Sequence, residues 1–84
     1  MKTPRGEIDL IARRGKTLAF VEVKQRATVE AAAMALDEYR LRRVANAAER
    51  LAPRYARPGD IQRIDAIFLV PGKLPRHMVN VWLG

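Results

Sequence analysis

Two acids and a lysine near the start of the chain carry side chains that could do chemistry together: Asp9, Glu22 and Lys24. Carboxylate oxygens are ligands that Mg²⁺ prefers, and an ion held by one or two carboxylates keeps waters and positions for a phosphate group. A lysine beside such an ion supplies a positive charge to a phosphate oxygen or to a nucleophilic water. These residue types therefore point to metal-dependent attack on a phosphate ester.

Two predicted β-strands, residues 6–12 and 18–24, must bring these side chains together. Gly15 and Lys16 suit the centre of a tight turn between the strands, because glycine accepts a positive φ at little cost. With that turn Asp9 lies opposite Glu22, and Glu7 lies opposite Lys24. Like charges that face each other across two strands are destabilising, so this pairing favours a bound cation between the acids.

Side chains alternate between the two faces of a strand. One face of the predicted hairpin is wholly apolar, and we expect it to face the core; it carries Ile8, Leu10, Ala12, Ala19, Val21 and Val23. The acids and Lys24 share the other face with Ile11 and Phe20. On the residues alone, the alternative to a metal site is an ordinary salt-bridged face in which Lys24 pairs with Glu7.

The runs G-E-I-D-L-I-A at residues 6–12 and F-V-E-V-K-Q-R at residues 20–26 closely resemble the YraN-like family (uncharacterised protein family 0102) of predicted endonucleases. Asp9 followed by Glu22-Val23-Lys24 also looks like the signature of the PD-(D/E)XK nuclease superfamily, to which Holliday-junction resolvases are related. The resemblance implies catalysis by Asp9, Glu22 and Lys24. It implies Mg²⁺ or Mn²⁺ held by Asp9, Glu22 and the Val23 carbonyl, with Glu7 as an auxiliary acid.

The same resemblance implies a restriction-endonuclease-like α/β core and a DNA substrate, with branched DNA as a candidate. YraN-like proteins usually carry a further N-terminal helix and strand before the G-E-I-D-L run. We therefore expect residues 1–84 to form a single, N-terminally short domain of this kind. The short N-terminus places activity in question, so a nuclease-fold module that only binds nucleic acid is the first alternative. A basic protein of a larger assembly is the second.

Composition favours a polyanionic partner. The chain has 84 residues, a formal net charge of +7 and a sequence pI of about 10.8. It has no cysteine, which excludes disulfides and thiolate metal sites and fits a bacterial cytoplasm. No apolar run approaches the length of a membrane span, so we expect no membrane partner.

The rest of the chain predicts one main helix and two more strands. Asp37 suits the helix cap, Pro53 its end, and apolar residues recur every three or four positions at Leu41, Val44, Ala48 and Leu51. Thr28 suits the cap of a shorter helix. Residues 64–70 and 78–83 read as strands, the first of them parallel to its neighbour, which gives a mixed sheet of about four strands.

Several charged residues outside the hairpin receive provisional roles. We predict that Arg26 and the helix arginines Arg40, Arg42 and Arg43 contact nucleic-acid phosphates, the alternative being a solvated helix face. Asp65 either supports the metal site or pairs with Arg63 or Arg26, and we favour the pairing. We expect His77 to lie at a loop edge without a special role. Apolar surface left by the absent helix would be covered by a second copy of the chain, giving a homodimer.

Overall fold

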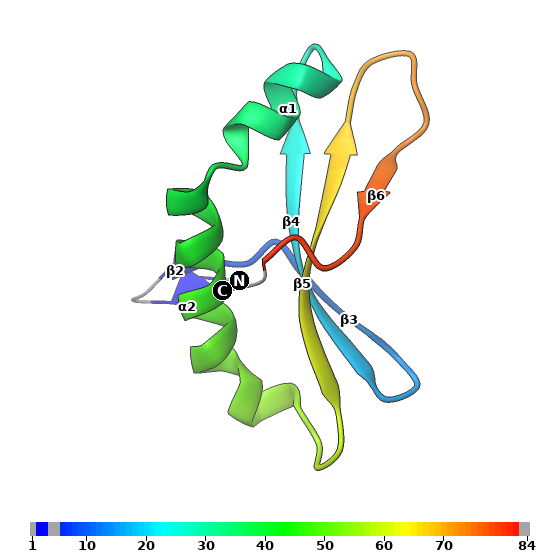
Figure 1. Cartoon of the computed structure of the whole chain (residues 1–84). Helices are drawn as coiled ribbons and strands as arrows, with labels where there is room; N and C mark the ends of the chain where they lie inside the picture. The colour runs from blue at the N-terminus through cyan, green and yellow to red at the C-terminus, as the bar shows by residue number, and fades with distance from the viewer. Residues whose placement is uncertain (1, 4–5, 83–84) are drawn as a thin grey trace.

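The computed structural model describes residues 2–3 and 6–82, and describes side chains from residue 8 onward (Figure 1). Its elements in chain order are β1 (Lys2–Thr3), β2 (Gly6–Glu7), β3 (Leu10–Arg14), β4 (Thr17–Gln25), α1 (Val29–Ala35), α2 (Glu38–Tyr55), β5 (Ile61–Leu69) and β6 (Arg76–Met78). None of the helices in this described part is long and apolar enough to cross a lipid bilayer.

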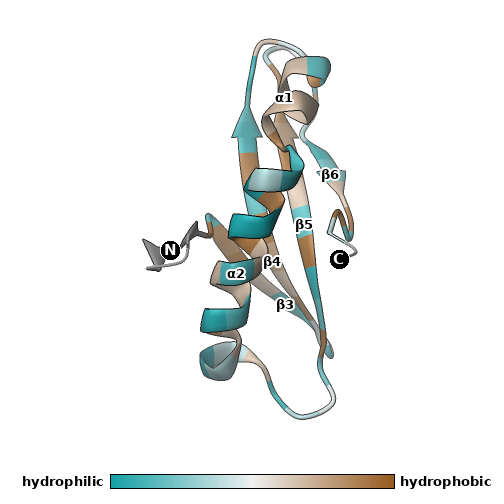
Figure 2. Cartoon of the chain, turned by 60° about the vertical axis from the view of Figure 1, so that its left-hand side comes forward, coloured by the Kyte–Doolittle hydropathy of each residue, from teal (hydrophilic) through white to brown (hydrophobic). Residues whose placement is uncertain are grey.

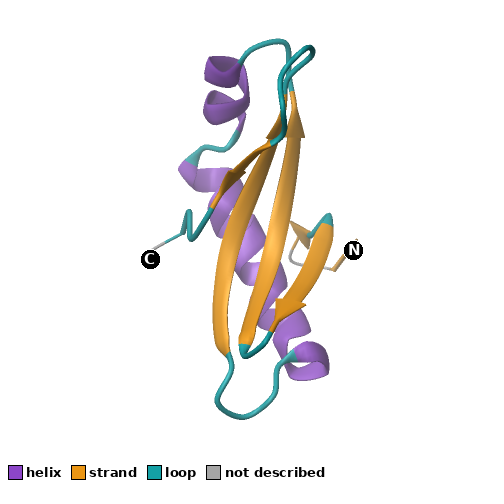
Figure 3. Cartoon of the chain, turned by 90° about the vertical axis from the view of Figure 1, so that its right-hand side faces the viewer, coloured by secondary structure: helices purple, strands orange, loops and turns teal. Residues whose placement is uncertain are grey.

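Four strands form a mixed sheet in the order β3-β4-β5-β6, in which β4 and β5 run parallel and the outer pairs antiparallel. A separate two-stranded ribbon, β1–β2, lies beside α2 (Figure 1). Both helices lie on one face of the sheet, and no described helix covers the other face (Figure 3). The predicted α/β class, the four-stranded mixed sheet and the parallel pairing are confirmed.

The β3–β4 hairpin has the predicted register, from Arg14 opposite Thr17 to Leu10 opposite Val21. Gly15 has a φ of 60°, which fixes the tight turn. The pairing stops at Leu10 because the chain bends at Asp9, and Glu7 pairs instead with Lys2. The predictions that Asp9 lies opposite Glu22 and that Glu7 lies opposite Lys24 in the hairpin are therefore wrong. The side chain of Glu7 lies outside the described part of the structure.

The core lies on the face of the hairpin that was expected to be polar. Leu18 and Phe20 of β4 and Ile64 of β5 are buried, and they pack against residues of α2, namely Val44, Ala47, Ala48 and Leu51. On the opposite face Val21 is buried between neighbouring strands, but Leu10 is 48% exposed. The prediction that the face with Leu10 and Ala12 meets the core is wrong, because both helices pack on the face that carries Phe20 and Phe68. Of the residues predicted on that apolar face, Ile8 does join the core with α2.

Both helices begin at the predicted caps. The Thr28 hydroxyl accepts a hydrogen bond from the Ala31 N–H at 3.1 Å, and an Asp37 carboxylate oxygen accepts from the Arg40 N–H at 2.8 Å. Helix α2 continues two residues past Pro53, because a proline in the last turn removes one hydrogen bond without preventing the helix from finishing. Hydrophilic residues recur on the side of α2 that faces the viewer in Figure 2.

The last strand is shorter and earlier than predicted. β6 spans Arg76–Met78, so His77 lies in a strand and the predicted strand over 78–83 is wrong. Asn80 has a φ of 55° and turns the chain across the sheet edge. The Val81 N–H then donates to the Ile64 carbonyl at 2.8 Å, and Trp82 packs against the core. Leu83 lies outside the described residues.

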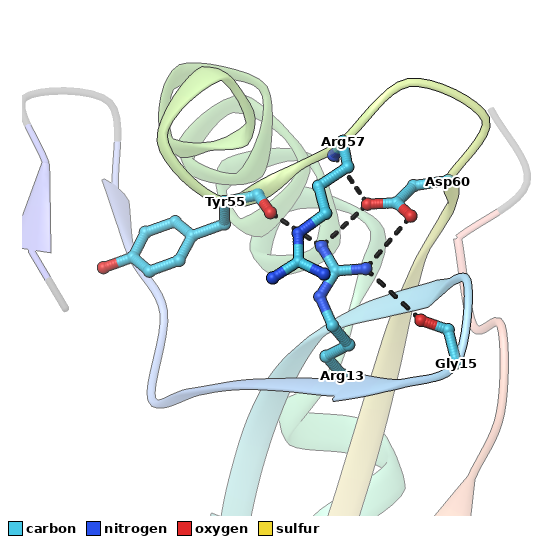
Figure 4. Close-up of polar contacts among 5 residues, drawn as sticks. All are labelled: Arg13, Gly15, Tyr55, Arg57 and Asp60. Atoms are coloured by element: carbon cyan, nitrogen blue, oxygen red, sulfur yellow. Dashed lines mark hydrogen bonds and ion pairs between the residues drawn. The ribbon is translucent and has the colours of Figure 1, made fainter.

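An arginine cluster ties the hairpin to the loop between α2 and β5 (Figure 4). The Arg13 guanidinium donates to both carboxylate oxygens of Asp60, at 3.0 and 2.7 Å, and to the Tyr55 carbonyl at 2.7 Å. The Arg57 N–H donates to the same carboxylate at 2.7 Å. The hydrogen bond from Arg13, with that from Arg57, lowers the pKa of Asp60 to about 2. The hairpin is thereby fixed against the end of α2.

Candidate active site

A pocket of about 250 Å³ lies between β4 and the N-terminal half of α2. Four residues of the predicted site line it: Asp9, Glu22, Val23 and Lys24. The helix contributes Arg40, Arg43 and Val44. The fold therefore gathers the predicted acids, the lysine and two of the four arginines predicted to contact nucleic acid into one concave, mainly polar place.

Glu22 and Lys24 enter this pocket because they lie two residues apart on β4, on the same face as Phe20. Lys24 Nζ lies 2.8 Å from Glu22 Oε1, and the side chains are only 9% and 12% exposed. The partner of Lys24 is thus Glu22. Ion pairs taken out of water gain little net stability, because desolvation offsets their attraction. A nearly buried pair at the wall of a pocket is for that reason a stronger indication of function than of stability.

Asp9 reaches the pocket from the bend between β2 and β3. Its Oδ2 accepts a hydrogen bond from the Val23 N–H at 2.9 Å, which fixes the carboxylate beside β4 where β3 no longer pairs with it. In an extended strand the N–H and C=O of one residue point to the same edge, so the Val23 carbonyl points to the side on which Asp9 lies. The bend that ends the hairpin pairing is also what positions this acid.

The donor set suits a hard divalent cation that keeps part of its water shell. It consists of the carboxylates of Asp9 and Glu22 and the backbone carbonyl of Val23, three residues that line the same pocket. Mg²⁺ is commonly held by one or two carboxylates with waters and substrate phosphate completing its shell. Nowhere among residues 8–82 do three or more histidine, aspartate or glutamate side chains gather as a ready-made metal site.

The four arginines predicted to bind nucleic acid fall into two groups. Arg40 and Arg43 line the pocket, and the Arg43 guanidinium lies 5.9 Å from the centre of the Tyr39 ring. Arg42 does not line it and pairs with Glu38 at 3.2 Å on the exposed side of α2. Arg26 is exposed beyond the end of β4, where its side chain donates to the Gln25 carbonyl at 2.7 Å. The structure therefore brings only Arg40 and Arg43 to the acids.

Asp65 belongs to a different cluster, on the sheet face that bears no helix. It is almost fully buried and accepts hydrogen bonds from Arg63 Nε at 3.0 Å and the Asn80 N–H at 2.9 Å, with His77 Nε2 at 2.8 Å. Burial acts to raise the pKa of Asp65, but the bonds with Asn80, His77 and Arg63 outweigh it and lower the pKa below its usual value. The favoured pairing with Arg63 is confirmed, and the contact with His77 was not anticipated.

Two groups near the site were not anticipated from the sequence. Val44 forms an apolar wall of the pocket, and a second pocket that Asp9 also lines contains Arg54 and Arg57. The spacing of Arg43, Arg50 and Arg54 was a signal for this, because residues seven and four apart share one side of a helix.

Comparisons with known proteins place these residues in a family. The sequence model of uncharacterised protein family UPF0102 matches residues 1–69. A UPF0102 protein of Sphingopyxis alaskensis is 58% identical over 82 residues, which cover 98% of this chain and 71% of the relative. A UPF0102 protein of Erythrobacter litoralis is 60% identical with the same coverage, and one of Caulobacter vibrioides is 47% identical over 85 residues, covering 68% of its length.

Proposed function

The chain belongs to uncharacterised protein family UPF0102, and we propose that it is a Mg²⁺- or Mn²⁺-dependent endonuclease of the PD-(D/E)XK type that hydrolyses phosphodiester bonds in DNA in the bacterial cytoplasm. One observation carries the proposal. Asp9, which lies 13 residues before Glu22, lines one pocket with Glu22, Val23 and Lys24, and α2 adds Arg40 and Arg43 to the same pocket. Acids for a metal and cations for phosphates thus meet at one place.

Each residue of the pocket has a chemical role in this proposal. Asp9 and Glu22, with the Val23 carbonyl, would hold the ion. When bound, the ion would polarise the scissile phosphate and lower the pKa of a coordinated water. The Lys24 ammonium, held by Glu22 at 2.8 Å, stabilises the negative charge that develops on the phosphate as water attacks phosphorus and a P–O bond breaks.

The two pocket arginines act on the substrate rather than on the reacting bond. Arg40 and Arg43 approach the acids from α2, so they are placed to contact phosphates next to the one being cleaved. Arg40 is itself fixed at the start of the helix, where its N–H binds the Asp37 cap. DNA held in this way presents a phosphodiester to Lys24, and the two arginines balance the negative charge of the neighbouring phosphates. Branched DNA is a substrate to test beside linear DNA.

A second candidate is a module that binds nucleic acid without cleaving it. The observation that favours it is that each acid already has a polar partner within the chain: Glu22 pairs with Lys24, and Asp9 accepts a hydrogen bond from the Val23 N–H. In that case the acids shape the pocket, and Arg40 and Arg43 supply the binding. The two candidates differ in their requirement for a metal.

The proposal is tested by cleavage of plasmid, linear and four-way-junction DNA with Mn²⁺ or Mg²⁺, and with a chelator. We expect cleavage only with metal, and a rate at least about 100-fold lower for Glu22→Gln. Glu30→Gln is the matched control, since Glu30 is an exposed acid in the first turn of α1, outside the pocket. It should cleave like the unmodified protein.

Two results would contradict the endonuclease. One is cleavage that persists in the chelator or in Glu22→Gln, because it would come from another source. The other is DNA binding without cleavage in either metal on all three substrates, which would favour the binding module.

A further inference from the structure

A second pocket, of about 550 Å³, adjoins the candidate active site. It lies between β3 and the C-terminal end of α2, and its charged and aromatic lining residues are Asp9, Arg13, Arg54, Tyr55 and Arg57. Asp9 lines both pockets, so the two meet at this carboxylate. The second pocket holds three arginines near the acid that the proposed reaction uses.

The three arginines differ in how firmly they are held. Arg13 is fixed by Asp60 and by the Tyr55 carbonyl, so its guanidinium serves the fold (Figure 4). Arg54 and Arg57 are exposed, and the polar bond that holds Arg57 runs through its backbone N–H. Both residues line the pocket, and the charge of Arg57 also acts on Asp60, which Arg13 binds through both carboxylate oxygens. A pocket of this composition attracts an anion.

The second pocket continues a row of arginines along α2. Arg43, Arg50 and Arg54 are seven and four residues apart, a spacing that puts them on one side of the helix. Arg43 lines the first pocket and Arg54 the second. Arg42, one residue from Arg43, points away from this row and pairs with Glu38. The row thus connects the two pockets along the same flank of α2.

We propose that this flank of α2, from Arg40 to Arg54, together with Arg57 just beyond the helix end, is the track on which one DNA strand lies, and that the second pocket binds the phosphates that flank the cleaved bond. Arg43 and Arg54 are about 16 Å apart along the helix axis. At about 3.4 Å of rise per nucleotide in a duplex strand, the track spans about five nucleotides. This inference rests on the proposed function, because Asp9 is the point where the two pockets meet.

The test is DNA binding by fluorescence anisotropy in a chelator, across a salt series, with the double variant Arg54→Ala/Arg57→Ala. We expect binding about tenfold weaker at 0.1 M salt and a slope of log affinity against log salt that is lower by about two, since each lost phosphate contact lowers it by about 0.9. The matched control is Arg42→Ala/Arg76→Ala, which removes the same charge from outside the track. The control should keep the slope of the unmodified protein.

Each outcome decides the inference. Equal losses of DNA affinity in both double variants would overturn the track, because net charge alone would then explain binding. No loss of DNA affinity in either double variant would also overturn it, because the second pocket would then not contribute to binding. No DNA binding by the unmodified protein would overturn it as well. Loss of binding to anionic phospholipid vesicles, with DNA binding kept, would assign the arginines to a membrane surface and also overturn it.

The endonuclease proposal fails separately from the track. If Arg54→Ala/Arg57→Ala shows the expected change in salt slope, but the unmodified protein neither binds Mn²⁺ nor cleaves DNA, the track is supported and the endonuclease proposal fails. If the unmodified protein cleaves DNA only with metal, but the salt slope is unchanged in Arg54→Ala/Arg57→Ala, the endonuclease proposal is supported and the track fails.

Discussion

Carboxylates on the two faces of the same sheet have different surroundings. On the open face Asp65 receives Arg63 Nε, the Asn80 N–H and His77, which use both of its oxygens. On the helix-covered face, among the described residues, Asp9 accepts one hydrogen bond and Glu22 pairs with one lysine. A carboxylate offers about four acceptor sites, so Asp65 is close to saturated, and Asp9 and Glu22 are not.

The contrast separates a carboxylate that holds the fold from two that are left with capacity for a ligand. Asp65 joins β5 to the segment after β6, and its saturation explains why burial does not raise its pKa. Asp9 and Glu22 face a pocket with arginines instead of a packed neighbour. The same substitution, aspartate to asparagine, should therefore affect two different properties at Asp9 and at Asp65.

The largest effect is expected for Asp9→Asn. Asparagine keeps the oxygen that accepts from Val23 N–H, so the unfolding free energy should change by less than about 1 kcal/mol. Loss of the charge should lower the cleavage rate about 1,000-fold, which corresponds to about 4 kcal/mol in the transition state. Urea unfolding measures the stability, single-turnover cleavage measures the rate, and fluorescence anisotropy measures the DNA affinity. A similar loss of cleavage with a comparable loss of DNA affinity would assign Asp9 to binding only.

Asp65→Asn should act on stability. An uncharged amide replaces a carboxylate that receives charged donors, and such hydrogen bonds are worth about 1.5–3 kcal/mol. We expect the unfolding free energy in urea to fall by about 2 kcal/mol while Mn²⁺ affinity stays the same. A fall of less than about 0.5 kcal/mol would remove the assignment of Asp65 as a structural acid.

Acid should weaken the cluster around Asp60 within a defined pH window. The pKa of Asp60 is lowered to about 2 from its ordinary 3.8, so its contribution to stability is full above pH 3.8 and is lost as pH falls toward 2. Thermal melts from pH 5 to pH 2 should show this loss, and Asp60→Asn should flatten it. Identical pH profiles for the two proteins would contradict the role given to the Arg13–Asp60 contact.

The smallest effect is expected for Arg42→Ala. Its exposed pair with Glu38 is of a kind worth about 0–1 kcal/mol, so stability should change by less than about 0.5 kcal/mol. DNA affinity should change less than about twofold, whereas Arg43→Ala should weaken it several-fold because Arg43 lines the pocket. Equal effects of the two substitutions on DNA affinity would show that the pocket does not distinguish them.

The sequence predicted the hairpin register correctly because one local feature decides it. Gly15 and its positive φ fix a two-residue turn, and the pairing down to Leu10 opposite Val21 follows. The prediction failed at Glu7, because the bend at Asp9 is stabilised by the Val23 N–H, a contact across the hairpin that alternation cannot reveal. Strand patterns describe a ladder but not where it stops.

The face of the sheet that meets the helices could not be read from alternation. Both faces of the hairpin carry apolar residues near the turn, and the large Leu18 and Phe20 lie on the same face as Glu22 and Lys24. Those two charged side chains break the apolar pattern on the face that becomes the core. Local rules are expected to fail at functional sites, where polar groups are buried for a reason other than packing.

The candidate site was predicted more fully than the core that surrounds it. Asp9, Glu22, Val23 and Lys24 line one pocket, although Asp9 reaches it from the bend after β2 and not from a paired position on β3. Choosing Arg40 and Arg43 over Arg42 required the position of α2 on the sheet, which is a tertiary property. The helix caps at Thr28 and Asp37 were correct because capping is local.

The most direct test of the central claim, that Asp9 and Glu22 form a metal site, is calorimetric titration of Mn²⁺ into the unmodified protein and Asp9→Asn. We predict binding of about one Mn²⁺ per chain in the unmodified protein, and binding at least tenfold weaker in Asp9→Asn, with an unchanged melting temperature. Equal Mn²⁺ binding in the two proteins, or none in the unmodified protein with or without DNA present, would contradict the metal site.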